Sequence, residues 1–297
     1  MEMEIRALKT QKNAIIMAHN YQPLEIQALA DVVGDSLELA VKAKEAEADL
    51  IVICGVRFMA ETAKILNPER KVIIPVLDAG CPLADFLTPG MIREAKKRHP
   101  DAAVVVYANS TAESKALADI VCTSANAVKV VASLPNDTIL FGPDSNLAAY
   151  VQRELPDKTI IPLPPGGHCY VHTGFTLVDV EAARRKGGVI ICHPECPPEI
   201  QERSDLIAST GGMVRGAAGE GEPWSVFTER EMVSRLRVLY PGRIFYEKPE
   251  AICVDMKKIS LDDLRQALER EEHEIILSRE VMDRARLAIE RMIAVGA

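Results

Sequence analysis

A threefold internal repeat constrains the fold of this chain more than any other feature of its sequence. Three polar motifs recur at comparable places along the chain: HNY at 19–21, YAN at 107–109 and HPE at 193–195. Their first residues are 88 and 86 positions apart, and the same two spacings separate Ser36, Ser124 and Thr210. This shared register indicates a unit of about 86 residues that occurs three times.

The segments that follow these motifs repeat as well, and we predict them to be helical. Each begins with Glu, has Asp six positions later and ends in Ser or Thr, over residues 25–36, 113–124 and 199–210. Cys81, Cys169 and Cys253 follow at spacings of 88 and 84. Any α/β protein repeats loosely because its βα units have similar lengths. That alternative explains recurring strands, but not polar groups and cysteines that coincide in register.

Short apolar runs alternate with helix-like stretches, a pattern typical of parallel sheets that are covered on both faces. The predicted strands are 14–18, 50–54, 72–75, 103–107, 138–141, 159–162, 189–192, 225–227 and 243–246. With the repeat, they predict an α/β fold of three homologous three-layer α/β/α domains with short parallel sheets. We expect a pseudo-threefold arrangement around a central active site.

The repeat also predicts the domain boundaries. We expect domains over residues 1–86, 87–173 and 174–270, each with its own predicted strands. The remaining segment, 271–297, is charged and has helical periodicity, so we expect it to pack back on the first domain.

Charge and hydropathy exclude several classes of protein. The net charge of −8 argues against a nucleic-acid groove or an anionic membrane surface. No apolar run approaches a membrane span, and the first residues lack the apolar core of a secretory signal. We therefore expect a cytoplasmic protein, in which the seven cysteines do not form a disulfide framework.

Ligands of parallel sheets bind beyond the carboxyl ends of the strands. There, each repeat offers two polar side chains two positions apart, which point to one side of an extended chain: His19 with Tyr21, Tyr107 with Asn109, and His193 with Glu195. Ser36, Ser124 and Thr210 precede helix-like stretches, as N-cap residues do, and helix starts bind anions. The third stretch, TGGMVRGAAGEG, is Gly-rich and a poor helix former.

Three of the cysteines have the spacing of the repeat, and the chain contains no CxxC pair of the kind that zinc sites use. Cys81, Cys169 and Cys253 suit three corners of a [4Fe–4S] cluster, whose fourth iron would stay open for substrate. A zinc site of these thiolates, with or without His168, is an alternative. The other four cysteines lack the register, and we interpret them as small buried hydrophobic residues: Cys54, Cys122, Cys192 and Cys196.

Several motifs together resemble the quinolinate synthase family. They are AHNYQ, GDSLELA, ILNP, YANSTAE, TSANAV, FGPD, NLA, GHCYVH, HPEC, STGGM, TERE and ICVDMKKI. The resemblance runs from about Asn13 to Leu268. It implies an enzyme that condenses iminoaspartate with dihydroxyacetone phosphate to quinolinate, phosphate and water, and it implies a [4Fe–4S] cofactor. A functional link to the enzyme that supplies iminoaspartate is a further expectation.

The resemblance also implies roles for single residues. Cys81, Cys169 and Cys253 would be the cluster ligands. The expected catalytic residues are Tyr21, Tyr107, His193 and Glu195, with Glu195 as general acid or base. The expected substrate-binding residues are His19, Ser36, Tyr107, Asn109, Ser124, His193, Glu195, Ser209 and Thr210.

Three other functions stay open on the sequence alone. The chain could be an electron carrier or redox sensor that holds an iron–sulfur cluster without catalysis. It could be a zinc-thiolate enzyme. It could also be a sugar-phosphate enzyme whose cysteines are structural, in which case replacing them would leave the activity intact.

Overall fold

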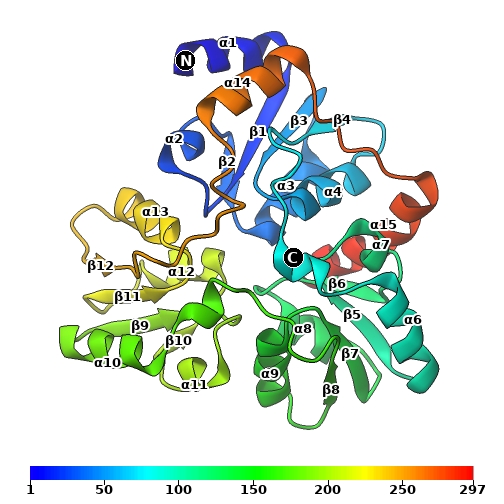
Figure 1. Cartoon of the computed structure of the whole chain (residues 1–297), viewed down its shortest axis with the longest axis vertical. Coiled ribbons are helices and arrows are strands. Elements are labelled where there is room, and N and C mark those ends of the chain that lie inside the picture. The colour runs from blue at the N-terminus through cyan, green and yellow to red at the C-terminus, as the bar shows by residue number, and fades with distance from the viewer. Residues whose placement is uncertain (297) are drawn as a thin grey trace.

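Three parallel four-stranded sheets form the framework of the molecule. The computed structural model describes residues 1–296. Its sheets have the strand orders β2-β1-β3-β4, β6-β5-β7-β8 and β10-β9-β11-β12, so one topology occurs three times. Helices flank each sheet, and the three units surround the centre of the molecule (Figure 1). The α/β fold predicted from the repeat is confirmed.

The elements follow one another in the same order in each unit. The first unit contains α1 Glu2–Gln11, β1 Ala14–His19, α2 Leu24–Gln27, β2 Val32–Gly34, α3 Ser36–Glu45, β3 Leu50–Cys54, α4 Arg57–Leu66 and β4 Lys71–Ile73. The second contains α5 Pro82–Asp85, α6 Pro89–Arg98, β5 Ala103–Tyr107, α7 Ala112–Lys115, β6 Ile120–Cys122, α8 Ala127–Ala132, β7 Thr138–Gly142, α9 Ser145–Glu154 and β8 Thr159–Pro162. The third follows the 3-10 turn His172–Gly174 and contains α10 Leu177–Lys186, β9 Val189–Cys192, α11 Pro198–Gln201, β10 Leu206–Ile207, α12 Thr210–Gly216, β11 Trp224–Phe227, α13 Glu231–Leu239 and β12 Phe245–Tyr246.

In each sheet the first strand lies between the second and the third, so the strand order reverses there. The crevice outside such a reversal point is where open α/β sheets bind ligands. β3 and β5 are buried at every position, which is why their sequences are apolar throughout instead of alternating. The fold therefore directs three ligand-binding edges toward one place.

The structure has twelve strands where nine were predicted, because the second strand of each unit is short. Residues 25–36, 113–124 and 199–210 were predicted as helical and this was wrong: each is a four-residue helix followed by a strand. The repeated Asp is the cause. Its backbone N–H donates to the carbonyl of the first strand, and its carboxylate accepts from the N–H of the same strand residue. The pairs are Asp31 with Ile16, Asp119 with Val104 and Asp205 with Ile190.

The helix caps also differ from the prediction. Ser36 and Thr210 are the first helical residues of α3 and α12, and the caps are the preceding residues, Asp35 and Ser209. Only the preceding residue has the extended backbone that lets its side chain reach back to the helix amides. Ser124 lies two residues before the cap of α8. The Gly-rich third stretch does form a helix, which Ser209 caps through the N–H of Gly212.

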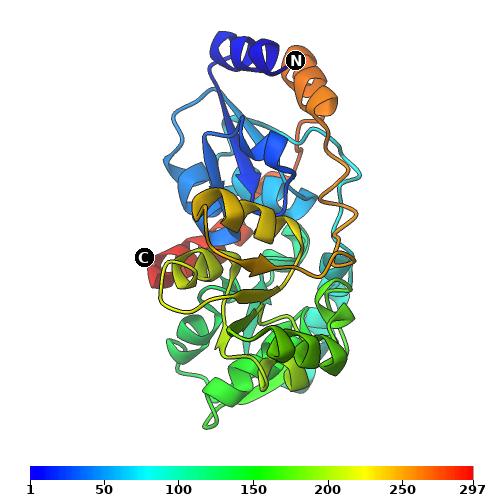
Figure 2. The ribbon, with the colours of Figure 1, turned by 90° about the vertical axis from the view of Figure 1, so that its left-hand side faces the viewer.

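Two helices follow the third sheet. α14 (Leu261–Arg270) packs against α1 of the first unit, and Figure 2 shows them side by side. α15 (Arg279–Gly296) contacts α4 of the first unit and also β6 and α7 of the second. Glu271 and His273 have a left-handed backbone, which ends α14. An extended segment follows, so the C-terminal helix begins only at Arg279. The domain boundaries stay a prediction.

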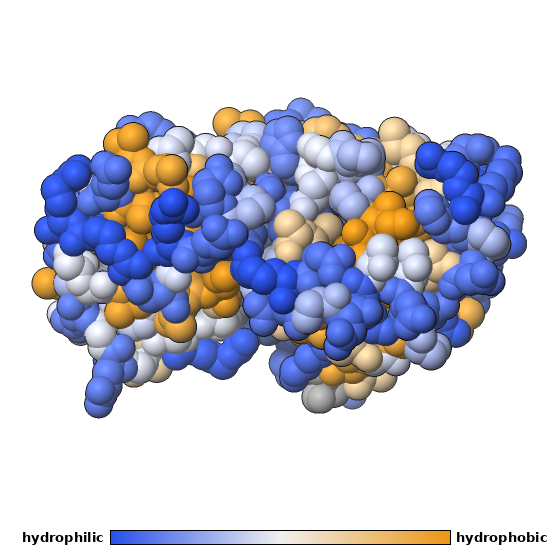
Figure 3. Space-filling model, turned by 90° about the horizontal axis from the view of Figure 1, so that it is seen from below, coloured by the Kyte–Doolittle hydropathy of each residue, from blue (hydrophilic) through white to orange (hydrophobic). Residues whose placement is uncertain are grey.

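The surface is polar over most of the face seen in Figure 3, with apolar patches between the charged residues. Among residues 1–296, none of the helices has the length and the apolar character that a membrane crossing requires.

Candidate functional site

The carboxyl ends of the three sheets open on one cavity. All predicted site residues line it except Ser209. They are His19, Tyr21, Ser36, Cys81, Tyr107, Asn109, Ser124, Cys169, His193, Glu195, Thr210 and Cys253. The three repeats therefore contribute side chains to a single site, and each contributes one cysteine.

Ser209 lies beside the cavity and joins two repeats. Its hydroxyl donates to Oδ2 of Asp35 at 3.2 Å, while Asp35 caps α3 through the N–H groups of Leu37 and Glu38. Thr210 makes a second link, because its hydroxyl oxygen accepts from Nδ2 of Asn20 at 3.0 Å. These bonds hold the start of α12 against the first repeat.

In each repeat, the short helix after the first strand (α2, α7 or α11) carries a buried donor that holds the loop with the site residues. Gln27, Lys115 and Gln201 have the spacings of the repeat, 88 and 86, and all three are buried. Each donates to main-chain carbonyls just after the first strand: Gln27 to Asn20 and Gln22, Lys115 to Ser110, and Gln201 to Pro194 and Cys196. Hydrogen bonds from these buried donors fix the position of the loop.

His19 and His193 are held in the same way. Nδ1 of each accepts the backbone N–H two residues later, from Tyr21 at 3.2 Å and from Glu195 at 3.3 Å. Burial lowers the pKa of both imidazoles to about 3, so both are neutral near pH 7. In the neutral ring the proton is then on Nε2, and in His193 this nitrogen lies 3.2 Å from Oγ of Ser124.

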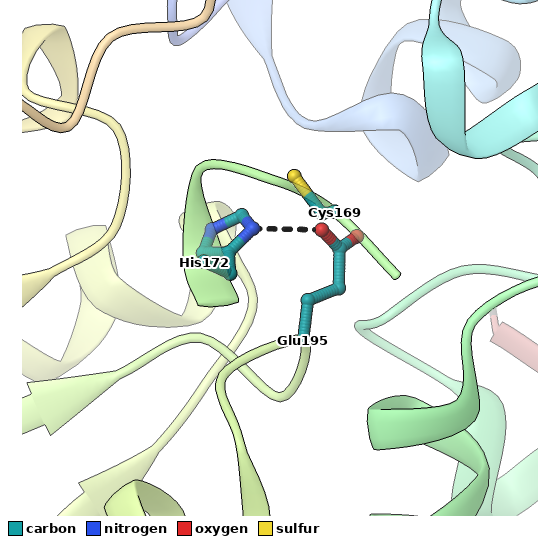
Figure 4. A group of neighbouring side chains, drawn as sticks. All are labelled: Cys169, His172 and Glu195. Atoms are coloured by element: carbon teal, nitrogen blue, oxygen red, sulfur yellow. Dashed lines mark ion pairs between the residues drawn. The ribbon is translucent and has the colours of Figure 1, made fainter. Parts of the chain in front are cut away.

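Glu195 is the centre of the polar network. The hydroxyl of Tyr107 donates to its Oε1 at 2.5 Å, and Nδ1 of His172 lies 2.8 Å from its Oε2, as Figure 4 shows. Burial tends to raise the pKa of Glu195, but His172, His193 and Tyr107 together hold it below its usual value. Burial and the charge of Glu195 raise the pKa of Tyr107, which stays a neutral donor.

Three further residues lie at the site, and no role was predicted for them: His172, Thr228 and Glu229. His172 stacks on His193 with ring centroids 4.5 Å apart, and its Nε2 lies 2.8 Å from Oγ1 of Thr228. The same Oγ1 is 2.5 Å from the hydroxyl of Tyr21. These residues belong to GHCYVH and TERE, which recur in no other repeat, so the register could not reveal them.

The loops that carry Cys81, Cys169 and Cys253 are tethered by one repeated backbone bond. The residue at the start of the helix after the third strand, which is the first helical residue in two repeats and the N-cap in the third, donates its N–H to the carbonyl two residues before the cysteine. The bonds are Arg57 to Ala79 at 2.8 Å, Ser145 to Gly167 at 2.8 Å and Arg230 to Ala251 at 2.9 Å. All three thiols are free.

The thiol spacing fits a group larger than one ion. Two sulfurs on one zinc are at most about 4.6 Å apart, since a Zn–S bond is about 2.3 Å. Within residues 1–296, the one set of three candidate ligands whose atoms all lie within 4.8 Å is Cys169, His172 and Glu195. The three cysteines are farther apart than that. In this set, His172 and Glu195 already contact each other without an ion. The donors can therefore hold a metal cofactor, and three thiols suit an iron–sulfur cluster.

The remaining four cysteines do not line the cavity. Cys54, Cys122 and Cys192 lie in the buried strands β3, β6 and β9, and Cys196 is buried in the loop after β9. Burial raises the pKa of Cys54 to about 12, which keeps its thiol protonated.

Comparison with known proteins gives one consistent result. The family described as "Quinolinate synthetase A protein" matches residues 3–294. The chain is 54% identical over 296 residues to the quinolinate synthase of Pyrococcus furiosus, covering 99% of this chain and 97% of that one. It is 54% identical to the quinolinate synthase of Thermococcus kodakarensis, covering 98% and 96%. It is 47% identical to the quinolinate synthase of Thermotoga maritima, covering 97% of each.

Proposed function

The chain belongs to the quinolinate synthase family, and from that premise we propose that it condenses iminoaspartate with dihydroxyacetone phosphate to form quinolinate, phosphate and water. One observation carries the proposal beyond the family: a single cavity collects three thiols and the polar side chains of all three repeats. An electron carrier needs no such cavity beside its cluster. The proposal places the enzyme in the cytoplasm, where thiols stay reduced.

Cys81, Cys169 and Cys253 would hold a [4Fe–4S] cluster, one from each repeat. When bound, such a cluster supplies a Lewis acid at the iron that has no protein ligand, which polarises a leaving hydroxyl group. The free thiols and their spacing support this assignment over a single zinc ion.

The substrates bring two carboxylates and one phosphate, and the cavity offers hydroxyl groups for them. Ser36 lines the cavity at the start of α3 and offers its hydroxyl, because Asp35 already accepts from the N–H groups of Leu37 and Glu38. Thr210 and Ser124 supply hydroxyls from the other two repeats. Ser209 acts through the link to Asp35 and holds the start of α12 in place. We assign His19 and Asn109 to substrate contacts, since both line the cavity.

Glu195 is the proposed general acid or base. It is 3% exposed, ionised, and within hydrogen-bond distance of the Tyr107 hydroxyl. Tyr107 donates to Glu195 and can pass a proton to or from a substrate oxygen. His193 presents its Nε2–H to Oγ of Ser124 and so orients the Ser124 hydroxyl. Tyr21 would assist proton transfer through its hydroxyl, which contacts Thr228.

Burial of these groups has a second consequence. His19, Tyr21, Tyr107, His193 and Glu195 are each 9% exposed or less. A site with so little water reduces hydrolysis of a labile imine and strengthens electrostatic contacts. Because free iminoaspartate hydrolyses, we propose a functional link to the enzyme that supplies it.

The test is a reaction with defined substrates. Protein loaded with iron and sulfide without oxygen is mixed with dihydroxyacetone phosphate and iminoaspartate generated in the assay, and quinolinate and phosphate are measured. We expect the two products in equal amounts, and neither when one substrate is omitted. Loaded protein that forms no quinolinate would contradict the proposal and favour an electron carrier or redox sensor.

A further inference from the structure

A buried carboxylate lies directly behind one of the cavity cysteines. Glu229 follows β11 by two residues, and its side chain is fully buried. Oε1 of Glu229 accepts the backbone N–H of Cys253 at 3.3 Å, and Oε2 accepts the N–H of Glu231 at 2.9 Å. One carboxylate therefore connects the cysteine loop to the start of α13.

Lys257 neutralises this carboxylate and extends the connection to the first repeat. Its Nζ lies 2.9 Å from Oε1 of Glu229, and it also donates to the main-chain carbonyl of Tyr21. The neighbouring Gln22 donates to the carbonyl of Met256 at 2.8 Å. The loop over residues 253–257 is thus fixed between Glu229 on one side and the Tyr21 loop on the other.

The second repeat has an acid at the equivalent place. In the sheet register, Phe227 pairs with Cys192 and Gly142 with Val106, so the residues two positions later, Glu229 and Asp144, correspond. Asp144 is buried, and its Oδ1 caps α9 through the N–H of Leu147 at 2.7 Å, while its Oδ2 has no hydrogen-bond partner within the described part of the chain.

Asp144 lies beside the Cys169 loop. A side chain at Gly167 would meet the carbonyl oxygen of Pro143 at 2.1 Å, so the two loops touch.

The first repeat lacks the acid. There, Ala18 pairs with Cys54, and the residue two positions after Cys54 is Val56, whose buried side chain cannot accept a hydrogen bond. The Cys81 loop has the backbone bond that all three repeats share and a bond from Lys258 to the carbonyl of Asp78, but no buried acid behind it among the described residues. The three cysteines therefore have equivalent backbones but different support.

We propose that Glu229 is a positioning residue that fixes the Cys253 loop, and that the Glu229–Lys257 pair couples this loop to the Tyr21 loop. The proposal rests on the proposed function, because it concerns the ligands of the same site. Glu229 also satisfies the start of α13, so a purely structural role has to be separated from positioning.

The first experiment measures amide hydrogen exchange in the full chain. Glu229→Leu removes both acceptors at similar size, whereas Glu229→Gln removes the charge but keeps one acceptor. We expect exchange in the segment that contains Cys253 to rise about tenfold in Glu229→Leu and less in Glu229→Gln, as for loss of a hydrogen bond to a charged group. The segments that contain Cys81 and Cys169 are internal references and should not change.

Met232→Ala is the matched control for stability. Met232 is buried on α13 and touches none of the cysteine loops by hydrogen bond, so it weakens the third repeat without removing the tether. In protein loaded with iron and sulfide, Glu229→Leu should change the electron paramagnetic resonance spectrum of the reduced cluster and speed iron release to a chelator. Met232→Ala should do neither, and Glu229→Gln should restore most of the wild-type spectrum.

The outcomes are separable. Unchanged exchange around Cys253 in both Glu229 variants would overturn the proposal, and so would the same spectral change in Met232→Ala. If Glu229→Leu does not fold, Glu229→Gln decides alone, through a rise confined to the Cys253 segment. Hydrogen exchange needs no turnover, so this proposal can fail while quinolinate formation stands, and the reverse also holds.

Discussion

The first and third repeats use the same backbone for different chemistry. β1 ends at His19 and His193 directly follows β9, and Nδ1 of each histidine accepts the N–H two residues later. At that later position the first repeat has Tyr21 and the third has Glu195. The hydroxyl of Tyr21 reaches Thr228 of the third repeat, while Glu195 accepts from Tyr107 of the second. Equivalent positions thus support different side chains, each of which contacts another repeat.

The repeated backbone therefore sets where the side chains lie, and the identity of the residue at each equivalent position sets what that side chain can bind or react with. Three kinds of contact recur in all three units. They are the bonds from the buried donors Gln27, Lys115 and Gln201, which we call the loop clamps, the backbone bonds of the cysteine loops, and the bonds from the repeated Asp to the first strand. The acid after the first strand, Glu195, occurs in one repeat, and the acid after the third strand in chain order, Glu229 or Asp144, occurs in two. Predictions that change one repeat at a time can therefore separate the two contributions.

The largest effect is expected for the cysteines, where the repeats should be equivalent. Replacing Cys81, Cys169 or Cys253 singly by Ser should abolish stable iron binding and quinolinate formation, because each supplies one of three ligands. Iron content and activity are measured on protein prepared without oxygen. Cys54→Ala is the control, because this thiol is buried in β3 outside the cavity. A serine variant with full iron and turnover would remove that cysteine from the site.

Glu195 and Tyr21 should differ most strongly between the first and third repeats. Glu195→Gln should lower kcat by about 10² to 10⁴, the range for loss of a general acid or base. Tyr21→Phe should lower it only about fivefold to tenfold, as expected for one neutral hydrogen bond. Steady-state kinetics on variants with equal iron content measure both. Equal losses would mean that the two positions share one role.

Removing a loop clamp should lower kcat/KM to a smaller extent, and by a similar factor in the first and third repeats. Gln27→Leu and Gln201→Leu each remove the buried donor that holds the loop after β1 or β9. We expect kcat/KM to fall about tenfold in each, because the reacting groups are displaced by a fraction of an ångström. Iron content should stay unchanged. A loss of iron instead would show that these loops support the cofactor.

Asp205→Asn should change stability and its pH dependence, and leave the chemistry alone. Burial tends to raise the pKa of Asp205, but hydrogen bonds from Arg184 and from the N–H of Ile190 lower it overall. A carboxyl with a lowered folded-state pKa stabilises the fold above its unfolded pKa of about 3.9, and this contribution disappears as the pH falls through the folded-state value.

The variant should therefore lose about 1 kcal/mol of unfolding free energy near pH 7. The difference from the wild type should shrink as the pH falls through the acid range, measured by urea unfolding. A constant difference down to pH 2 would contradict the ionic role of Asp205. Val178→Ala on the exposed face of α10 is a control that should change neither quantity.

Much of the fold could be predicted because the repeat carries it. Nearly all of the predicted strands overlap real ones closely, since buried parallel strands are continuous apolar runs. β2, β6 and β10 were missed because they have only two or three residues and directly follow a helical turn. The Asp that ends each of those turns was visible in the sequence, but its bond to the first strand is a tertiary contact.

The site was predictable to the same extent. His19, Tyr107 and His193 follow from the strand ends, and the three cysteines follow from the register. His172 was not, because it lies in a 3-10 turn that the other repeats lack, three residues after Cys169. Asp35 and Ser209, and not their neighbours, cap the helices because the entry angle of the chain decides the cap, and spacing alone does not show that angle.

The most direct test of the whole account is the metal content of the full chain. Iron, acid-labile sulfide and zinc are measured per chain in protein purified without oxygen. The account predicts about four iron and four sulfide per chain, and no stoichiometric zinc. Little iron after anaerobic reconstitution, or one zinc per chain, would contradict the assignment of the three thiols and with it the proposed chemistry of the cavity.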